Sequence, residues 1–208
     1  MAHMTTELTP ARRYRGAEAE ERRAQRRVQL IAAAVQVYGE RGYQNATVKA
    51  VCEAAGLTER YFYESFANSE ALLLASFQTV THRLLHTLAL AGEGAGGDGQ
   101  QRALAMLRAY FGALQREPRS ARVFLVEIRG VSKLVDGALA ESLDEFGGML
   151  AQALLPPGRK LDPLLTAGVA GGVVHIALRW ITHGYAPDVE VVARTALQLA
   201  LVLAHEPD

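Results

Sequence analysis

Apolar residues recur at helical spacing along nearly the whole chain, and no convincing run alternates apolar and polar positions. This pattern predicts an all-α fold of about nine helices. Hydrophobic residues make up 50% of the 208 positions, which indicates a real core rather than disorder. The predicted helices span approximately residues 18–41, 48–55, 59–66, 68–90, 100–116, 119–129, 132–155, 162–183 and 188–204.

Capping and breaking residues mark several helix ends. Thr47 and Thr58 stand where N-cap hydroxyls would begin the second and third helices. Gly56 lies between these helices and predicts a tight turn, because glycine readily ends a helix in the left-handed conformation. The segment GEGAGGDG at 92–99 is rich in glycine and predicts a flexible loop.

The short helix at 59–66 has one apolar side. On a helical wheel Phe62 and Phe66 lie close together and define its buried stripe. The preceding helix buries Val48, Val51 and Ala55, so the two are expected to pack across the turn as a helix-turn-helix. The outward side of 59–66 then carries Arg60, Glu64, Tyr61 and Tyr63.

These outward groups suit contact with DNA, because the second helix of this motif enters the major groove. Arg60 can donate two hydrogen bonds to a guanine edge. Tyr61 can meet a thymine methyl or a phosphate, and Tyr63 a phosphate. Thr47 offers a hydroxyl and a helix N-terminus to another phosphate, and Lys49 adds charge nearby.

The charge is unevenly distributed, although Lys+Arg and Asp+Glu balance at 22 each. Between Arg12 and Arg27 lie seven arginines and three glutamates. This surplus predicts a basic arm whose arginines, Arg26 among them, follow the DNA backbone or enter the minor groove.

A different interpretation is that residues 59–66 only present a solvated face with two half-buried tyrosines. Glutamates at 53, 59 and 64 would repel phosphates. They leave open a helix-turn-helix that binds another protein rather than specific DNA.

The stretch from Ile31 to Leu74 resembles the DNA-binding domain of TetR-family transcription regulators. The shared features are the helix ending in Y-G-E-R-G-Y, Thr47, the sequence A-A-G-L-T, the Tyr63-x-x-Phe66 pair and E-A-L-L in the next helix. The chain departs from the family at Ser65 and Ser69, where a histidine and a lysine are usual. It also has Arg60 or Tyr61 where a small residue is usual, so an unusual DNA sequence preference is expected.

The resemblance implies a dimeric regulator of transcription, expected to be a repressor, which binds a palindromic operator and leaves it on binding a small molecule. With the opening MAHM, which looks like expression-vector sequence, and the arginine surplus, three regions are predicted: a tag remnant and basic disordered arm at 1–17, a helix-turn-helix domain at 18–67, and a ligand-binding and dimerisation domain at 68–208. Together with the chemistry above, the predicted DNA contacts are Arg26, Thr47, Lys49, Thr58, Glu59, Arg60, Tyr61, Tyr63 and Ser69.

The last two predicted helices carry a signal for a second copy of the chain. The first has a cluster of small residues that would let another helix approach closely, and the last has a broad apolar face. In TetR-like proteins this pair forms a four-helix dimer interface, although ordinary core packing would give the same pattern. The predicted interface residues are Ala167, Gly168, Gly171, Val192, Ala196, Leu199 and Leu203.

The resemblance also implies a pocket for a largely apolar effector in the bundle. His175, Arg179 and His183 lie four apart on an otherwise apolar helix, so a buried cation there would need a partner such as Glu127, Asp144 or an acidic ligand. The alternatives are that Arg179 and His183 lie at a wet interface edge and that His175 is a hydrogen-bonded core histidine. The aromatic candidates are core residues by default. The predicted ligand contacts are Tyr110, Phe111, Phe124, Glu127, Met149, His175 and Arg179.

Other classes of function find little support in the sequence. No H-E-x-x-H, G-x-S-x-G or P-loop motif occurs, and His175 and His183 lie too far apart along a helix to share a metal ion. We therefore expect no enzyme activity, cofactor or metal site. The single cysteine, Cys52, and the polar N-terminus suggest a cytoplasmic protein, and the apolar stretch at 167–178 is too short to span a membrane.

Overall fold

The computed structural model describes residues 10–156, 158–159 and 162–204, and this part of the chain contains nine α-helices and no strand. The predicted tag remnant and the first half of the arm lie outside the described residues. The α-helices are α1 (Pro10–Arg41), α2 (Val48–Ala55), α3 (Glu59–Ser65), α4 (Ser69–Gly94), α5 (Gly99–Arg116), α6 (Pro118–Arg122), α7 (Lys133–Leu154), α8 (Pro163–Thr182) and α9 (Val189–Ala200).

Several boundaries differ from those predicted. The first helix begins at Pro10 rather than at 18, so residues 10–17 are helical and not a disordered arm. Their sequence contains good helix formers and no proline after Pro10, which favours continuation of the helix. The segment predicted at 119–129 divides into α6 and a π-helical turn, η2 (Val123–Glu127). Two short 3₁₀ turns, η1 (Tyr43–Asn45) and η3 (Leu201–Ala204), complete the set.

Side-chain caps fix the starts of several helices. Thr47 Oγ1 accepts a hydrogen bond from Ala50 N–H at 3.1 Å, as expected for the cap of α2. Asn68 caps α4 in the same way, through Ala71 N–H at 2.8 Å. Thr58 stands at the N-cap of α3, but its side chain makes no capping bond.

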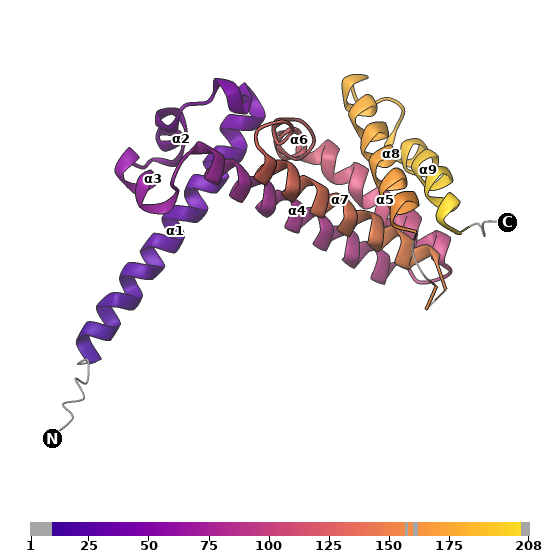
Figure 1. Cartoon of the computed structure of the whole chain (residues 1–208), viewed down its shortest axis with the longest axis horizontal. Helices are drawn as coiled ribbons and strands as arrows, with labels where there is room; N and C mark the ends of the chain where they lie inside the picture. The colour runs from indigo at the N-terminus through magenta and orange to yellow at the C-terminus, as the bar shows by residue number, and fades with distance from the viewer. Residues whose placement is uncertain (1–9, 157, 160–161, 205–208) are drawn as a thin grey trace.

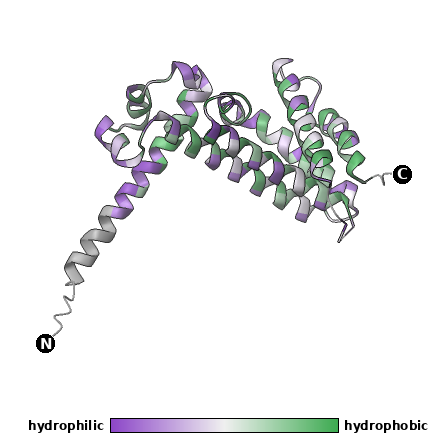
Figure 2. Ribbon diagram, viewed as in Figure 1, coloured by the Kyte–Doolittle hydropathy of each residue, from purple (hydrophilic) through white to green (hydrophobic). Residues whose placement is uncertain are grey.

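The helices form two connected units (Figure 1). Helices α1, α2 and α3 lie together at the N-terminal end, and α4 runs from them along the second unit, where α5 and α7 pack beside it. Helices α8 and α9 cover the far end, with α8 against α7 and α9 against α5. Apolar residues line the facing sides of these helices (Figure 2), and the core extends through both units from Leu30 to Leu203.

Helix α8 keeps much of its apolar surface exposed. Leu164 is 85% exposed, and only 39% of the most apolar window of this helix is buried. By length and composition alone α8 could cross a membrane, whereas the sequence predicted a stretch too short to do so. Core helices of soluble proteins can have the same length and composition.

Candidate nucleic-acid interface

The turn between α2 and α3 holds the two helices at a fixed angle. Gly56 adopts a left-handed conformation, with φ of 66°, and its N–H donates to carbonyls at the end of α2. The chain therefore reverses within one residue at a position where a Cβ would be strained. Val51 and Cys52 of α2 are buried in the same cluster as Phe62 of α3, and burial raises the pKa of the Cys52 thiol.

The outward face of α3 follows the helical-wheel prediction in part. Phe62 and Phe66 are buried, and the Arg60 side chain is 84% exposed. Tyr63 is 62% exposed and keeps only its ring edge against Phe62, with 5.1 Å between centroids. Arg60 and Tyr63 are therefore accessible to a partner outside the protein.

The arginines at the end of the predicted basic arm contact the protein itself. Arg23 Nε donates to the Glu64 carbonyl at 3.1 Å, and Arg27 Nη1 donates to the Ser65 carbonyl at 2.9 Å. These carbonyls end α3, where the helix dipole favours positive charge. Arg23 and Arg27 thus connect α1 to the end of α3, a role that the charge surplus alone did not reveal.

Arg26 and Tyr61 also differ from the prediction, because they contact each other. The Arg26 guanidinium lies over the Tyr61 ring, 4.3 Å from its centroid, and 3.7 Å from a Glu64 carboxylate oxygen. Tyr61 is consequently half-buried. Arg26 positions α3 rather than standing free for the minor groove.

Exposed ion pairs offset part of the positive charge on this surface. Arg60 Nε donates to Glu64 Oε1 at 3.0 Å, and Lys49 lies 3.9 Å from Glu53. Exposed pairs of this kind contribute only about 0–1 kcal/mol, so a phosphate or base edge can replace the carboxylate. The pairs reduce the positive charge without removing it.

The remaining predicted contacts surround the same surface. Thr47, Thr58 and Glu59 are exposed, and Ser69 is the half-buried first residue of α4. The Thr47 oxygen already accepts from Ala50, so its hydroxyl hydrogen is the group left for a phosphate.

Glu127, one of the predicted ligand contacts, joins the two units. Its Oε2 accepts from the backbone N–H of Tyr43 at 2.7 Å, and its Oε1 accepts from Arg122 Nε at 2.7 Å. Its side chain is only 10% exposed. The π-helical turn η2 presents this carboxylate to η1, a contact across 84 positions of sequence that no local pattern indicates.

The predicted aromatic ligand contacts form the core of the bundle. Tyr110 stacks on Phe146 at 5.1 Å, Phe111 meets Trp180 edge-on at 5.5 Å, and Phe124 stacks on Phe77 at 5.8 Å. Burial raises the pKa of the Tyr110 hydroxyl, which has no hydrogen-bond partner in the described part of the chain.

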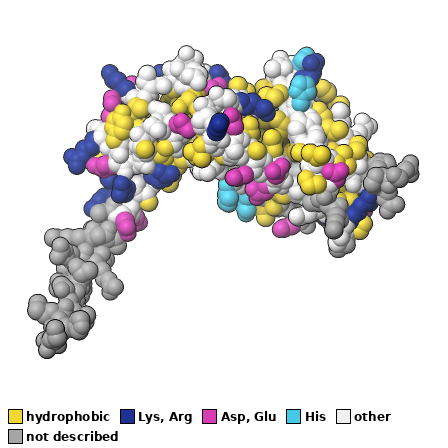
Figure 3. Space-filling model, in the orientation of Figure 1, with side chains coloured by type: hydrophobic (Ala, Val, Ile, Leu, Met, Phe, Trp, Pro, Cys, Tyr) yellow, Lys and Arg dark blue, Asp and Glu magenta, His cyan; other side chains and the backbone are white. Residues whose placement is uncertain are grey.

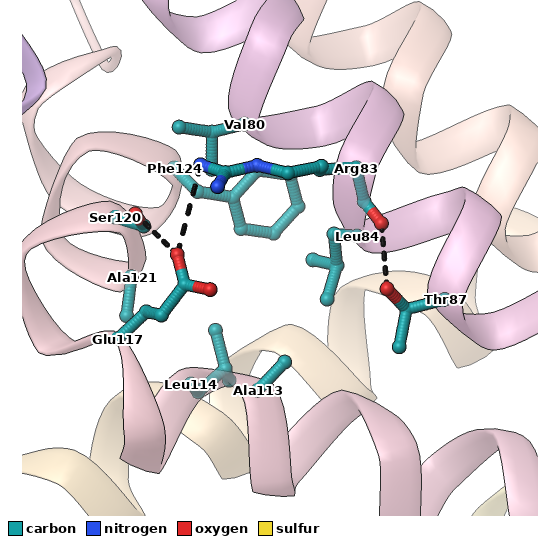
Figure 4. A pocket seen from close by; sticks show the side chains of 10 residues that line it. All are labelled: Val80, Arg83, Leu84, Thr87, Ala113, Leu114, Glu117, Ser120, Ala121 and Phe124. Carbon is teal, nitrogen blue, oxygen red and sulfur yellow. Dashed lines mark hydrogen bonds and ion pairs between the residues drawn. The ribbon is translucent and has the colours of Figure 1, made fainter. Parts of the chain in front are cut away.

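A small cavity of about 60 Å³ lies between α4, α5 and α6 (Figure 4). Phe124 and Leu84 line it, and Glu117 points across it to Arg83 at 3.6 Å and to the Ser120 hydroxyl at 3.0 Å. Its volume suits a few water molecules or a small ligand group.

His175 and Arg179 do not face the bundle. Both are exposed on the outer side of α8, and His183 Nδ1 lies 2.7 Å from the Arg179 carbonyl. The exposure of Arg179 and His183 fits a wet edge. His175 is exposed too, so it is neither a core histidine nor paired with a buried partner such as Glu127 or Asp144.

The predicted dimer residues divide between the two helices. Ala167, Gly168 and Gly171 are exposed on α8. Those after α8 instead pack inside the chain: Val192 and Ala196 of α9 and Leu203 of η3 are buried, and Leu199 of α9 is half-buried against the Gly172 position. The exposed side of this end of the chain is Val191, Thr195, Gln198 and Val202.

Residues 30–76 match the family described as "Bacterial regulatory proteins, tetR family". No curated protein sequence matches the chain. Among solved structures, the fatty acid degradation regulator FadR from Bacillus halodurans is similar, with a TM-score of 0.72 and 23% identity over 85% of this chain and 94% of that one.

Two further structures share the fold. The transcriptional regulator FadR from Bacillus subtilis in complex with stearoyl-CoA has a TM-score of 0.72 and 20% identity, over 86% of this chain and 99% of that one. A TetR-like transcriptional regulator from Rhodococcus sp. RHA1 has a TM-score of 0.67 and 20% identity, over 87% and 97%.

Proposed function

We propose that the chain, whose residues 30–76 match the tetR family of bacterial regulatory proteins, is a cytoplasmic repressor of transcription. It binds a palindromic operator as a homodimer and is released by a small-molecule effector. The observation that carries the proposal is the face of α3 on which Arg60 and Tyr63 are exposed opposite the buried Phe62.

The geometry of this face supports reading of DNA in the major groove. Arg60 lies near the N-terminus of α3, the part of a recognition helix that meets base edges. Tyr63, Thr47 and Lys49 flank it with a phenol, a hydroxyl and an ammonium group, which suit phosphates. Base reading and backbone positioning thus fall on neighbouring residues.

The outer faces of α8 and α9 support a dimer. Leu164, Gly168 and Gly171 follow one side of α8, and Val191 and Val202 follow one side of α9 and η3. An exposed apolar face of this kind marks an interaction site. Two copies joined there would present two α3 helices to one duplex, as a palindrome requires.

Release by an effector is supported by contacts between the two units. Glu127 accepts from Tyr43 of η1 and from Arg122, and both Glu127 and Arg122 belong to the segment that also lines the cavity in Figure 4 through Ser120 and Phe124. A ligand that moves this segment would loosen the hold on the helix-turn-helix and shift the population away from the DNA-binding state. The stearoyl-CoA complex of the Bacillus subtilis neighbour is one example of a small molecule bound to this fold.

Fluorescence anisotropy tests the proposal, with labelled DNA from the region upstream of the gene. We expect tight binding to an inverted repeat, weaker binding to scrambled DNA, and a loss of affinity as salt concentration rises. Failure to bind any palindrome in a salt-sensitive manner would refute the proposal.

The ion pairs of Arg60 with Glu64 and of Lys49 with Glu53 favour one second candidate, a helix-turn-helix that binds another protein. The two functions differ in the same assay. A protein-binding module would show equal and weak affinity for the inverted repeat and for scrambled DNA.

A further inference from the structure

We propose that a groove between α4 and α7 binds an amphipathic organic cation, whose ammonium group lies at Glu141 and Glu145. Its role as the effector rests on the function proposed above, but binding in the groove does not. The groove has a volume of about 370 Å³, within the range of small-molecule sites. It is distinct from the smaller cavity in Figure 4, with which it shares no lining residue.

The apolar part of the groove would hold a hydrocarbon chain. Phe77 and Leu85 of α4 and Met149 of α7 contribute to its lining. Met149 is half-buried, and a thioether side chain adapts to ligands of different shape. Of the predicted ligand contacts, Met149 is the one that lines this groove.

Thr81 gives the groove an unsatisfied polar group. The residue is only 7% exposed, its hydroxyl has no hydrogen-bond partner among the residues that the structure describes, and it lines the groove. Other hydroxyls on α4 bond to the carbonyl one turn earlier, as Ser76 does to Leu72 and Thr79 does to Ala75, both at 2.8 Å. A buried hydroxyl without a partner is costly, so a ligand group that bonds to Thr81 Oγ1 would be favoured.

The charges around the groove select a cation. Glu141 and Glu145 lie one turn apart on α7, and none of the described lining residues is a lysine or arginine. Figure 3 shows histidine and acidic side chains side by side on the surface of this part of the molecule. An ammonium group would find two carboxylates there, whereas an anionic ligand would be repelled.

The occupant is an organic cation rather than a metal ion. His82 and His86 also line the groove and stack on each other, with 6.5 Å between ring centroids. Among the described residues, however, no three His, Cys, Asp or Glu side chains are grouped closely enough to hold a metal ion. The apolar lining also has no use in binding a bare ion.

Isothermal titration calorimetry on the full chain tests the site with three probes of equal length: octylammonium, octanol and octanoate. We expect octylammonium to bind at least about tenfold more tightly than octanol, and octanoate more weakly still, because only the cation pairs with the carboxylates. Equal affinity for octanol and octylammonium would overturn the proposal, as would heat from Zn²⁺ alone that His82→Ala removes.

Two variants locate the binding. The double variant Glu141→Gln and Glu145→Gln is expected to lose about tenfold or more in affinity for octylammonium, whereas Asp144→Asn, outside the groove lining, leaves it unchanged. Thr81→Val is expected to weaken binding by about two- to tenfold without lowering the melting temperature, because the hydroxyl has no partner to lose. Thr79→Val is its matched control and keeps full affinity. Unchanged affinity in both groove variants would overturn the assignment.

The link to regulation is measured separately. Octylammonium is expected to lower the affinity for the inverted repeat in the anisotropy assay, and less so for the double variant. An effect of equal size in both proteins would refute the effector role. Lack of DNA binding by the ligand-free protein would refute the proposed function, and calorimetry would still decide whether the groove binds the cation.

Discussion

Glu64 Oε1 accepts a hydrogen bond from Arg60 Nε at 3.0 Å, so the exposed arginine of α3 is paired with a carboxylate one turn away on the same helix. The same carboxylate lies 3.7 Å from Arg26, which in turn covers the Tyr61 ring. Glu64 therefore joins α1 to α3 and also reduces the charge that DNA would meet.

Substitution of Glu64 by glutamine is expected to strengthen DNA binding. The change removes a negative charge from the recognition face and releases Arg60, so affinity for both specific and scrambled DNA should rise by about three- to tenfold at low salt, and less at high salt. Anisotropy over a salt series measures this. Glu93→Gln, at the far end of α4, is the control, and an equal change in both variants would contradict the expectation.

Arg60→Ala and Tyr63→Phe are expected to differ in kind. Loss of Arg60 should reduce discrimination between the inverted repeat and scrambled DNA by about 1–3 kcal/mol, because a base contact is lost. Loss of the Tyr63 hydroxyl should weaken binding to both DNAs alike, because a phosphate contact carries no sequence information. Equal losses from both variants on both DNAs would contradict this division.

Glu127→Ala should destabilise the chain through the contact between its two units. The change leaves the Tyr43 N–H and the Arg122 Nε–H without their acceptor, which is expected to lower the free energy of unfolding by about 1.5–3 kcal/mol. Glu117→Ala, which breaks a more exposed pair with Arg83, should cost less than about 1 kcal/mol. Urea denaturation compares the two, and similar losses would show that the Glu127 contact is unimportant.

Gly171→Glu tests the dimer without disturbing the protomer. A Cβ at Gly171 meets nothing within 4 Å, so the variant should fold with an unchanged circular dichroism spectrum and elute as a monomer in size exclusion with light scattering. Gly137→Glu on α7 is the matched control, because a Cβ there also meets nothing within 4 Å. A dimeric Gly171→Glu protein would place the interface elsewhere.

The ion pair between α5 and α9 predicts a dependence of stability on pH. Hydrogen bonds from Arg108 at 2.6 and 2.7 Å, with a further bond from Arg194, lower the pKa of Glu190 from 4.5 to about 2. The pair therefore stabilises the fold fully above pH 4.5, and its contribution decreases as pH falls toward 2. Urea denaturation should show a difference between wild type and Glu190→Gln at pH 6 that shrinks by pH 3. A difference that is constant over this range would contradict the assignment.

The sequence was sufficient for the local features of the fold. The limits of α2 follow from the Thr47 cap and the Gly56 turn, and both are properties of a few adjacent residues. The burial of Phe62 and Phe66 follows from helical spacing in the same way. These features depend on neighbours in sequence, which periodicity and capping rules describe directly.

Contacts between distant segments were beyond such rules. The position of Arg26 over Tyr61 depends on how α1 passes α3, and the bond from Tyr43 to Glu127 joins the two units. On α9 both sides carry apolar residues, so the pattern could not show that Val192 faces inward and Val191 outward. Thr81 gave no signal, because a threonine in a helix usually bonds to its own backbone.

The uninterrupted course of α4 gives the molecule a mechanical property. Twelve residues separate Ser69, at the helix-turn-helix, from Thr81, at the groove, which corresponds to about 18 Å of helix. A tilt of only about 5° around Thr81 would therefore move the start of α4 by about 1.5 Å. In the proposed dimer on DNA, a displacement of that size would occur in both copies and would be comparable with the tolerance of a hydrogen bond to a base edge.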